Sequence, residues 1–126
     1  HPGSPRLPAT KGTSSLAFHP AKPVLISGGK DGYLRFWRTD QDHQLTREIA
    51  AHKGGIYRIL FNDDGSLCAT CSRDRTIKIW NANSFEPLHR LDRVAGGHTH
   101  SVNSILWIDD LLISASDDRT LIAWPI

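Results

Sequence analysis

The residues with the clearest chemical potential are a histidine, a serine and an aspartate that occur together twice in the chain. The members are, in chain order, His52, Ser72 and Asp74, and then His98, Ser116 and Asp118. The same three residue types form the catalytic triad of many hydrolases, in which the histidine takes the proton of the serine hydroxyl. The chain has no Gly-x-Ser-x-Gly motif to expose such a serine, and both sets recur together with their surroundings. We therefore expect no catalytic residue in either set.

Cys68 and Cys71 have the Cys-x-x-Cys spacing of half a zinc site or of a redox pair. The chain has no second cysteine pair to complete a zinc site. Both residues also fall in a predicted strand, where positions three apart face opposite sides. We interpret them as core cysteines and predict that the protein needs neither a metal nor a cofactor.

These candidate residues lie within an internal repeat. Two sets of aromatic residues recur at its period, namely Trp37, Trp80 and Trp124, and upstream of them Phe18, Phe61 and Trp107. The spacing of each set predicts three copies of a unit of about 43–46 residues, which together fill nearly the whole chain.

Each unit has the local pattern of short β-strands. Segments 33–37 and 76–80 alternate their side chains with a period of two, and turn-forming residues such as those at 62–65 separate the runs. A more polar fourth run follows the tryptophan in two units, at 44–49 and 87–91, and its polarity suits an outer edge strand. No stretch of ten residues carries a helical apolar stripe, so we expect an all-β fold.

The repeat resembles that of the WD-repeat β-propeller family. The family pattern is a Gly-His pair, a strand ending in Phe, a Ser-x-Asp turn and a closing Trp. The middle unit carries His52, Phe61, Ser72, Asp74 and Trp80, and the third carries Gly97, His98, Trp107, Ser116, Asp118 and Trp124. The first unit departs most, because it has Ala9 at the histidine position and keeps only Asp31 and Trp37.

The resemblance implies three four-stranded antiparallel blades of a β-propeller. We expect the units at about 9–51, 52–97 and 98–126, with residues 1–8 as a candidate outer strand. A propeller closes its ring with about 4–8 blades, so three units require either missing sequence or a second copy of the chain. The absence of methionine and the start at His1 also indicate a piece of a longer chain.

The resemblance further implies a structural role for the recurring polar residues. In the family, a histidine, a serine, an aspartate and the tryptophan indole form a buried hydrogen-bonded chain within a blade. The two sets implied here are His52, Ser72, Asp74 and Trp80, and His98, Ser116, Asp118 and Trp124. Such a chain satisfies the buried indole N–H and fixes the imidazole tautomer.

The function implied by the resemblance is that of a non-catalytic scaffold that binds other proteins or peptides at one rim of the ring. Carried over by register, the docking residues are Lys53, Tyr57, Arg73, Thr99, Asn103, Asp117, Thr10, Ser14 and Lys30. Tyr57 and Arg73 are the strongest candidates, because aromatic residues and arginine are enriched at binding hot spots. The alternative is the propeller part of a larger enzyme or sensor whose catalytic residues lie outside this chain.

Composition limits the partners. The net charge is only +2 and the charged residues are mixed along the chain, so we expect no nucleic-acid or membrane partner. The apolar runs are far shorter than the ~18–20 residues of a membrane span. We expect a cytoplasmic protein whose partners are other proteins or peptides, together with the remainder of the propeller or a second copy of itself.

Overall fold

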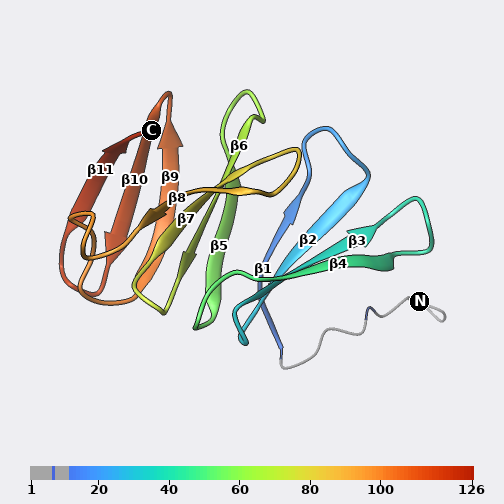
Figure 1. The fold of residues 1–126 in the computed structure, drawn as a ribbon, viewed down its shortest axis with the longest axis horizontal. Helices are drawn as coiled ribbons and strands as arrows, with labels where there is room; N and C mark the ends of the chain where they lie inside the picture. The colour runs from blue at the N-terminus through green and yellow to red at the C-terminus, as the bar shows by residue number, and fades with distance from the viewer. Residues whose placement is uncertain (1–6, 8–11) are drawn as a thin grey trace, which may run out of the picture.

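The computed structural model describes Leu7 and residues 12–126 and contains eleven strands in three sheets (Figure 1). The first sheet has β1 (Thr13–Phe18), β2 (Val24–Gly29), β3 (Tyr33–Arg38) and β4 (Gln44–Ala50). The second has β5 (Ile56–Phe61), β6 (Leu67–Ser72), β7 (Ile77–Asn81) and β8 (Pro87–Leu91), and the third has β9 (Val102–Ile108), β10 (Leu111–Ser116) and β11 (Leu121–Pro125). Strands that follow one another within a sheet pair antiparallel. The predicted all-β fold of three consecutive antiparallel sheets is confirmed.

Three of the four tryptophans, Trp37, Trp80 and Trp124, occupy equivalent positions. Each lies on the third strand of its sheet and pairs with the second residue of the preceding strand, in the pairs Leu25 with Trp37, Cys68 with Trp80 and Leu112 with Trp124. The repeat in the sequence is therefore a repeat of strand register.

The third sheet has three strands instead of the four predicted for every unit. The polar run that follows the tryptophan in the first two units, and that forms β4 and β8, has no counterpart after Trp124. Within the part of the chain that the structure describes, no strand pairs with the outer edge of β11. Of the candidate outer strand at 1–8, only Leu7 is described, and it is not in a strand.

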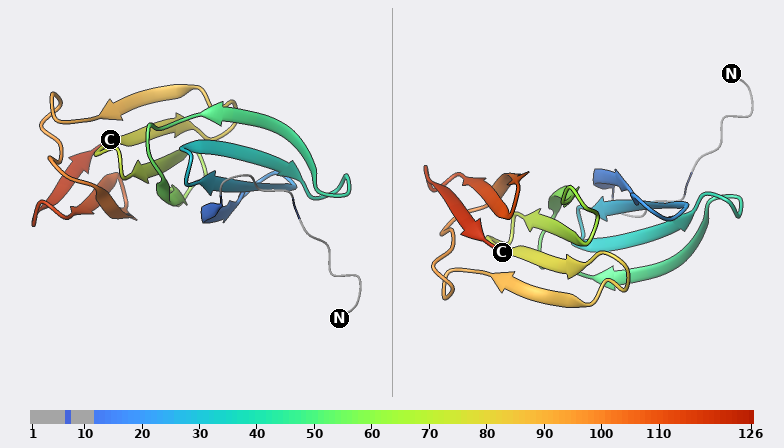
Figure 2. Two further views of the ribbon diagram at one scale, coloured as in Figure 1. Left: turned by 90° about the horizontal axis from the view of Figure 1, so that it is seen from below. Right: turned by 90° about the horizontal axis from the view of Figure 1, so that it is seen from above.

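The sheets pack face to face around two apolar clusters. The first cluster joins the first two sheets, and its members include Ile26, Leu34, Phe36, Ile59 and Trp80. The second joins the last two sheets, and its members include Ile77, Ile79, Val102, Ile105 and Leu112. The middle sheet therefore has one cluster on each face and is covered on both. Figure 2 shows the outer strands β4 and β8 on one side of the molecule and β1 on the other.

The outer faces of the first and third sheets remain apolar and exposed. Leu16 on β1 is 63% exposed, whereas its counterpart in the middle sheet, Ile59, is 4% exposed. Leu121 on β11 is 73% exposed, whereas its counterpart Ile77 is fully buried. Each end sheet thus presents the kind of surface that the middle sheet buries against a neighbour. No helix among the described residues is long and apolar enough to cross a membrane.

Candidate functional site

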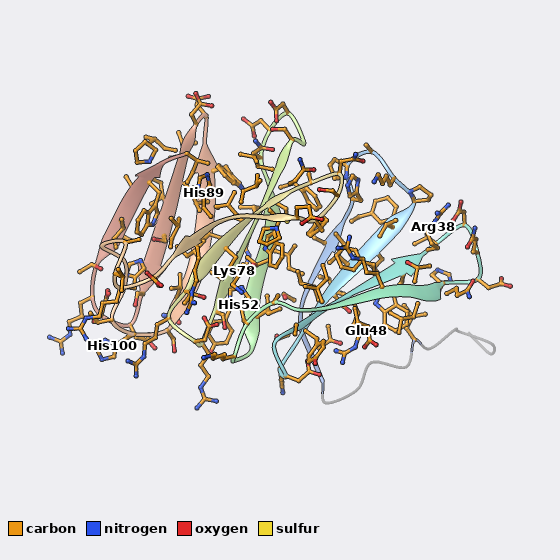
Figure 3. The ribbon with its side chains drawn as sticks, in the orientation of Figure 1. Arg38, Glu48, His52, Lys78, His89 and His100 are labelled. Carbon is orange, nitrogen blue, oxygen red and sulfur yellow. The ribbon has the colours of Figure 1, made fainter. Side chains whose placement is uncertain are left out.

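One end of the sheets gathers the turns that follow the second strands and the connections between sheets. Because successive strands are antiparallel, the β2–β3, β6–β7 and β10–β11 turns meet the β4–β5 and β8–β9 connections at this end. We call these five connections the rim, which lies along the lower edge of Figure 1. Figure 3 shows His100 at the rim end of the third sheet and Arg38 toward the opposite end of the first.

The connections of the rim are held to one another by hydrogen bonds between segments far apart in sequence. The N–H groups of Ala51 and His52 both donate to the carbonyl of Gly32, at 3.1 and 3.0 Å. The Arg73 N–H donates to the Gly55 carbonyl at 3.0 Å, and the Ser101 hydroxyl donates to the Arg73 carbonyl at 3.3 Å. The rim is therefore a set of turns whose backbones are fixed across sheet boundaries.

A buried hydrogen-bonded chain runs inward from the rim in the middle sheet. The Trp80 indole donates to the Thr70 hydroxyl at 2.9 Å, and this hydroxyl lies 2.8 Å from His52 Nε2. His52 Nδ1 lies 3.1 Å from the carboxylate of Asp74, which also accepts from the Thr76 hydroxyl. The indole can only donate, so the Thr70 hydroxyl accepts from it, and the ionised Asp74 carboxylate can only accept, so His52 Nδ1 carries a proton and donates to it.

The third sheet repeats this chain. The Trp124 indole donates to the Ser114 hydroxyl at 3.0 Å, and this hydroxyl lies 2.7 Å from His98 Nε2. His98 Nδ1 lies 2.9 Å from the Asp118 carboxylate, which also accepts from the Thr120 hydroxyl. Every buried side-chain nitrogen and oxygen among the described residues has a hydrogen-bond partner.

The hydroxyls in these chains differ from the two serines that the sequence predicted. Ser72 and Ser116 lie two residues further along their strands, where their hydroxyls donate to the carbonyls of Gly54 and His100 and accept from the N–H groups of Asp74 and Asp118. The physical reason is diagonal packing between neighbouring strands. Trp80 pairs with Cys68, but its indole reaches Thr70, two residues further along β6, and Trp124 reaches Ser114 past Leu112 in the same way. The serines instead tie the rim connections to the turns.

A signal for the correct hydroxyls is present in the sequence. A hydroxyl residue stands ten positions before each of Trp37, Trp80 and Trp124, and the three residues are Ser27, Thr70 and Ser114. The indole of each tryptophan donates to that residue in the structure. This spacing recurs in all three units, including the first, where the family pattern is weakest.

The first sheet replaces the histidine chain with an arginine. Trp37 donates to Ser27 at 3.0 Å, and Asp31 accepts two bonds from the Arg35 guanidinium, which also pairs with Glu48 at 2.8 Å. Arg35 is only 7% exposed, and it pairs with Ser27 across strands β2 and β3. The expected histidine position, Ala9, lies outside the described residues.

The carboxylates of the two histidine chains are held ionised. Burial acts to raise the pKa of Asp74, but the hydrogen bond and charge of His52, with bonds from Thr76 and the Lys53 N–H, lower this pKa well below its ordinary value. For Asp118, burial again acts upward, and bonds from Thr120, His98 and the Thr99 N–H lower the pKa well below its ordinary value. Both aspartates are therefore acceptors at neutral pH.

Acid is expected to destabilise the fold through these two groups. A carboxylate whose pKa is lower in the folded than in the unfolded chain contributes stability that is complete above the unfolded pKa of about 4. That contribution is lost as the pH falls through the unfolded value toward the folded one. We expect the urea midpoint to drop as the pH falls below about 5, and to drop less steeply in Asp74→Asn. An equal slope in the variant would contradict this assignment, and Asp63→Asn, at an exposed turn, is the control.

The triad-like geometry of these chains does not form an accessible catalytic site. Thr70 and Ser114 are fully buried, and each hydroxyl is already engaged by an indole. A hydrolase nucleophile must reach its substrate. In this structure neither hydroxyl can be reached from solvent.

Cys68 and Cys71 point into different cores. Cys68 belongs to the cluster between the first two sheets and Cys71 to the cluster between the last two. Burial raises the pKa of the Cys71 thiol to about 12 and raises that of Cys68 as well. Among the described residues, no three His, Cys, Asp or Glu side chains gather as metal ligands. That the protein needs neither metal nor cofactor stays a prediction.

The described docking residues lie along the rim but differ in their exposure and in whether they are hydrogen-bonded within the protein. Lys30, Lys53 and Arg73 are exposed. Asn103 donates to Asp117 at 2.6 Å. Among the others, Tyr57 packs against the second apolar cluster, the Thr99 N–H donates to Asp118, Ser14 donates to the Ile56 carbonyl, and Thr10 lies outside the described residues. The structure also places Arg75, Arg93 and Arg119, which the sequence interpretation omitted, as exposed residues on the rim.

The chain is similar to proteins of known family. The chain is 32% identical to nuclear distribution protein PAC1 of Arthroderma otae, over 90% of this chain and 26% of that protein. WD repeat-containing protein 55 of Arabidopsis thaliana is 31% identical over 82% of this chain and 29% of its own length. The solved structure of U3-55K has a TM-score of 0.82 at 21% identity and covers 94% of this chain and 37% of that chain. The chain thus spans about a quarter of the curated relatives.

The family model described as "WD domain, G-beta repeat" matches residues 6–38, 43–81 and 85–125. Each match ends on the third strand of a sheet, and the second and third begin just before β4 and β8. The matches cover most of the chain and confirm the family resemblance of its repeats. This chain belongs to the WD domain, G-beta repeat family.

Proposed function

We propose that this chain is a non-catalytic scaffold that binds other proteins or peptides at the rim, within a propeller that has further blades. The observation that carries the proposal is that the backbone of the rim is fixed while some of its side chains are free. Its backbones are fixed across sheet boundaries, while the side chains of Lys30, Lys53 and Arg73 extend into solvent. A rigid base with free side chains binds at a low cost in conformational entropy.

The absence of enzymatic activity is part of this proposal. The residues that resemble a hydrolase triad have their hydroxyls buried and bonded to indoles, which supports a structural role. The protein and peptide partners, the exclusion of nucleic acid and membranes, and the cytoplasmic location belong to the same proposal. Two free, buried cysteines are compatible with a reducing compartment.

A site-specific photo-crosslinker tests the rim. We expect the crosslinker to capture a partner protein when it replaces Lys53 or Arg73, which are exposed on the rim. Asp63 and Asn83, exposed at the opposite end, are the matched control positions. Capture from both ends, or only from the control positions, would contradict docking at the rim.

The apolar end faces supply a second test. We propose that further blades of the same propeller cover them, and we expect the isolated 126-residue chain to associate through these faces. Light scattering should give a mass larger than one chain. Replacing exposed Leu121 with lysine should reduce association, whereas the same change at Leu88, exposed on β8, should not. A compact monomer at high concentration would contradict the proposal, and a defined dimer would favour pairing with a second copy.

A further inference from the structure

The rim carries cationic side chains that have no ionic partner within the described residues. These residues, which we call the cationic rim, are Lys30, Lys53, Arg73, Arg75, Arg93 and Arg119, and all are exposed. None takes part in an ion pair of the described chain, where the arginines that do are Arg35, Arg38 and Arg90. Their charges are therefore available to a partner.

The carboxylates at the same end are already engaged. Asp31 binds Arg35, Asp74 binds His52, and Asp118 binds His98. Asp92 pairs with Arg90 at 3.4 Å, and Asp117 accepts from Asn103. Asp31, Asp74, Asp92 and Asp118 are thus paired within the protein, and Asp117 is exposed and bonded to a neutral amide, while the six cations face solvent.

Two of these arginines occupy an unfavourable backbone conformation. Arg75 has φ of 76° and Arg119 has φ of 70°, and the equivalent residue of the first sheet is Gly32, with φ of 84°. Glycine adopts this left-handed region without the steric cost that arginine incurs. The Arg75 and Arg119 side chains make no hydrogen bond within the described residues that would offset this cost. Turns at the opposite end hold Asp42, His43, Phe85 and Asp109 in the same region, so the conformation itself is a turn feature, and what distinguishes Arg75 and Arg119 is the cation that each places at the rim.

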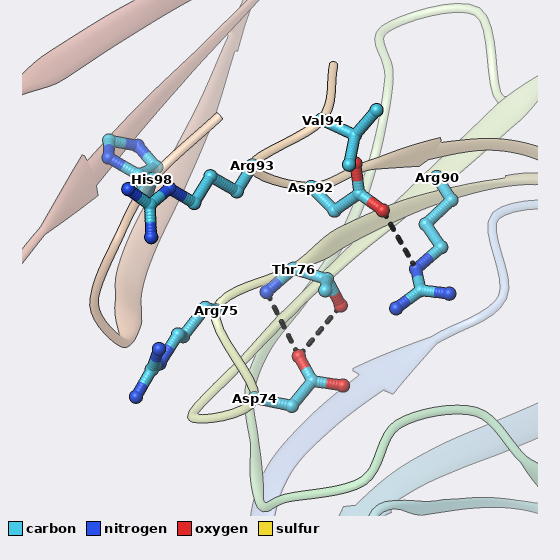
Figure 4. Close-up of a pocket in the computed structure, with 8 residues that line it drawn as sticks. All are labelled: Asp74, Arg75, Thr76, Arg90, Asp92, Arg93, Val94 and His98. Carbon is cyan, nitrogen blue, oxygen red and sulfur yellow. Dashed lines mark hydrogen bonds and ion pairs between the residues drawn. The ribbon is translucent and has the colours of Figure 1, made fainter. Parts of the chain in front are cut away.

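Arg75 and Arg93 also border a pocket of about 240 Å³ beside the β6–β7 turn. Figure 4 shows both side chains extending to the same side, away from the ion pair of Arg90 and Asp92. Asp74 faces the pocket with one oxygen bonded to Thr76. Guanidinium groups in this arrangement suit the planar, two-oxygen geometry of a carboxylate.

The opposite end of the sheets has the reverse charge. Its turns carry seven acidic residues, namely Asp40, Asp42, Asp63, Asp64, Glu86, Asp109 and Asp110. The cations there are Lys22 and, at the end of β3, Arg38. The positive character of the rim is therefore local and does not follow from the net charge of +2. Such a distribution orients an acidic partner toward the rim and away from the other end.

We infer that the partner docked on the rim presents an acidic peptide segment, whose Asp and Glu carboxylates bind the cationic rim around Arg75, Arg93 and Arg119. This inference rests on the proposed docking function. A peptide fits better than nucleic acid, because a peptide can place a neutral residue opposite the exposed Asp117, whereas a nucleic-acid strand carries a phosphate at every nucleotide. The exposed ring of Tyr33 borders the rim beside the β2–β3 turn, so the RNA probe below tests the alternative of a strand whose bases stack there.

The test uses the intact protein with three labelled probes of equal length: a peptide alternating Glu and Gly, its Gln counterpart, and single-stranded RNA. Fluorescence polarisation should show binding of the Glu peptide that weakens as salt rises, and little binding of the Gln peptide. The double variant Arg75→Gly with Arg119→Gly should bind the Glu peptide about tenfold more weakly. The double variant Lys22→Gln with Arg38→Gln removes equal charge at the opposite end and should bind normally.

Thermal unfolding separates binding from folding in the same variants. Glycine is the residue that the first sheet has at this turn position, so Arg75→Gly with Arg119→Gly should unfold at the same or a higher temperature. Unchanged peptide affinity in this variant would overturn the inference, and so would equal affinity for the Glu and Gln peptides. Tighter binding of RNA would favour a nucleic-acid partner instead. If either peptide result overturns the inference while a crosslinker at position 53 or 73 still captures a protein, the rim docks a partner but not through acidic residues.

Discussion

Replacing Thr70 with valine is expected to lower the free energy of unfolding by about 2–4 kcal/mol. Valine keeps the shape of threonine but removes the acceptor of the Trp80 indole and the hydrogen-bond partner of His52 Nε2. Both groups would remain buried without a partner, and each unsatisfied buried group costs about 1–3 kcal/mol. Urea unfolding, followed by tryptophan fluorescence, measures the change.

Ser72→Ala is the matched comparison, because it removes the hydroxyl that the family pattern assigns to this chain. Ser72 binds the Gly54 carbonyl and the Asp74 N–H at the rim. We expect a smaller loss, about 1 kcal/mol, because no buried indole or imidazole is left unpaired. A larger loss for Ser72→Ala than for Thr70→Val would show that the serine, and not the threonine, links the histidine to the tryptophan.

The second large effect is expected at Gly32. Alanine at this position is expected to lower the free energy of unfolding by about 3 kcal/mol. Gly32 has φ of 84°, and an added Cβ would collide with the backbone carbonyl of His52. The same residue accepts from the Ala51 and His52 N–H groups, so the turn cannot move away without breaking those bonds.

Gly96→Ala is the control for the conformational part of this effect. Gly96 has φ of 87°, but nothing lies within 4 Å of an added Cβ. Alanine there incurs only the left-handed backbone cost of about 1–2 kcal/mol. Equal losses at the two positions would indicate that the close approach between the β2–β3 turn and the β4–β5 connection does not stabilise the fold.

The local level of the structure could be predicted from the sequence. The strands, the equivalence of Trp37, Trp80 and Trp124, and the three sheets follow from side-chain alternation and from a period that repeats along the chain. Strand pairing between successive runs joined by short turns is local in sequence. The opposite directions of Cys68 and Cys71 follow from the same alternation.

The identity of the hydrogen-bonding partners depended on contacts between strands. Which hydroxyl meets an indole is decided by the diagonal offset across two strands, so Thr70 and Ser114, and not Ser72 and Ser116, complete the chains. In the first sheet, Asp31 binds Arg35, a partner that the family pattern does not indicate. The sequence repeat shows equivalent positions but not the reach of each side chain.

Charge at the rim is the clearest case of what the sequence alone determines and what only the folded chain decides. The amino-acid sequence determines the repeat, the strands and a net charge of +2 with mixed signs along the chain. Only the tertiary structure separates these signs in space, because antiparallel strands bring alternate connections to opposite ends of the molecule. Residues distant in sequence, such as Lys30, Arg75 and Arg119, thereby share one rim, while the acidic turns gather at the other end.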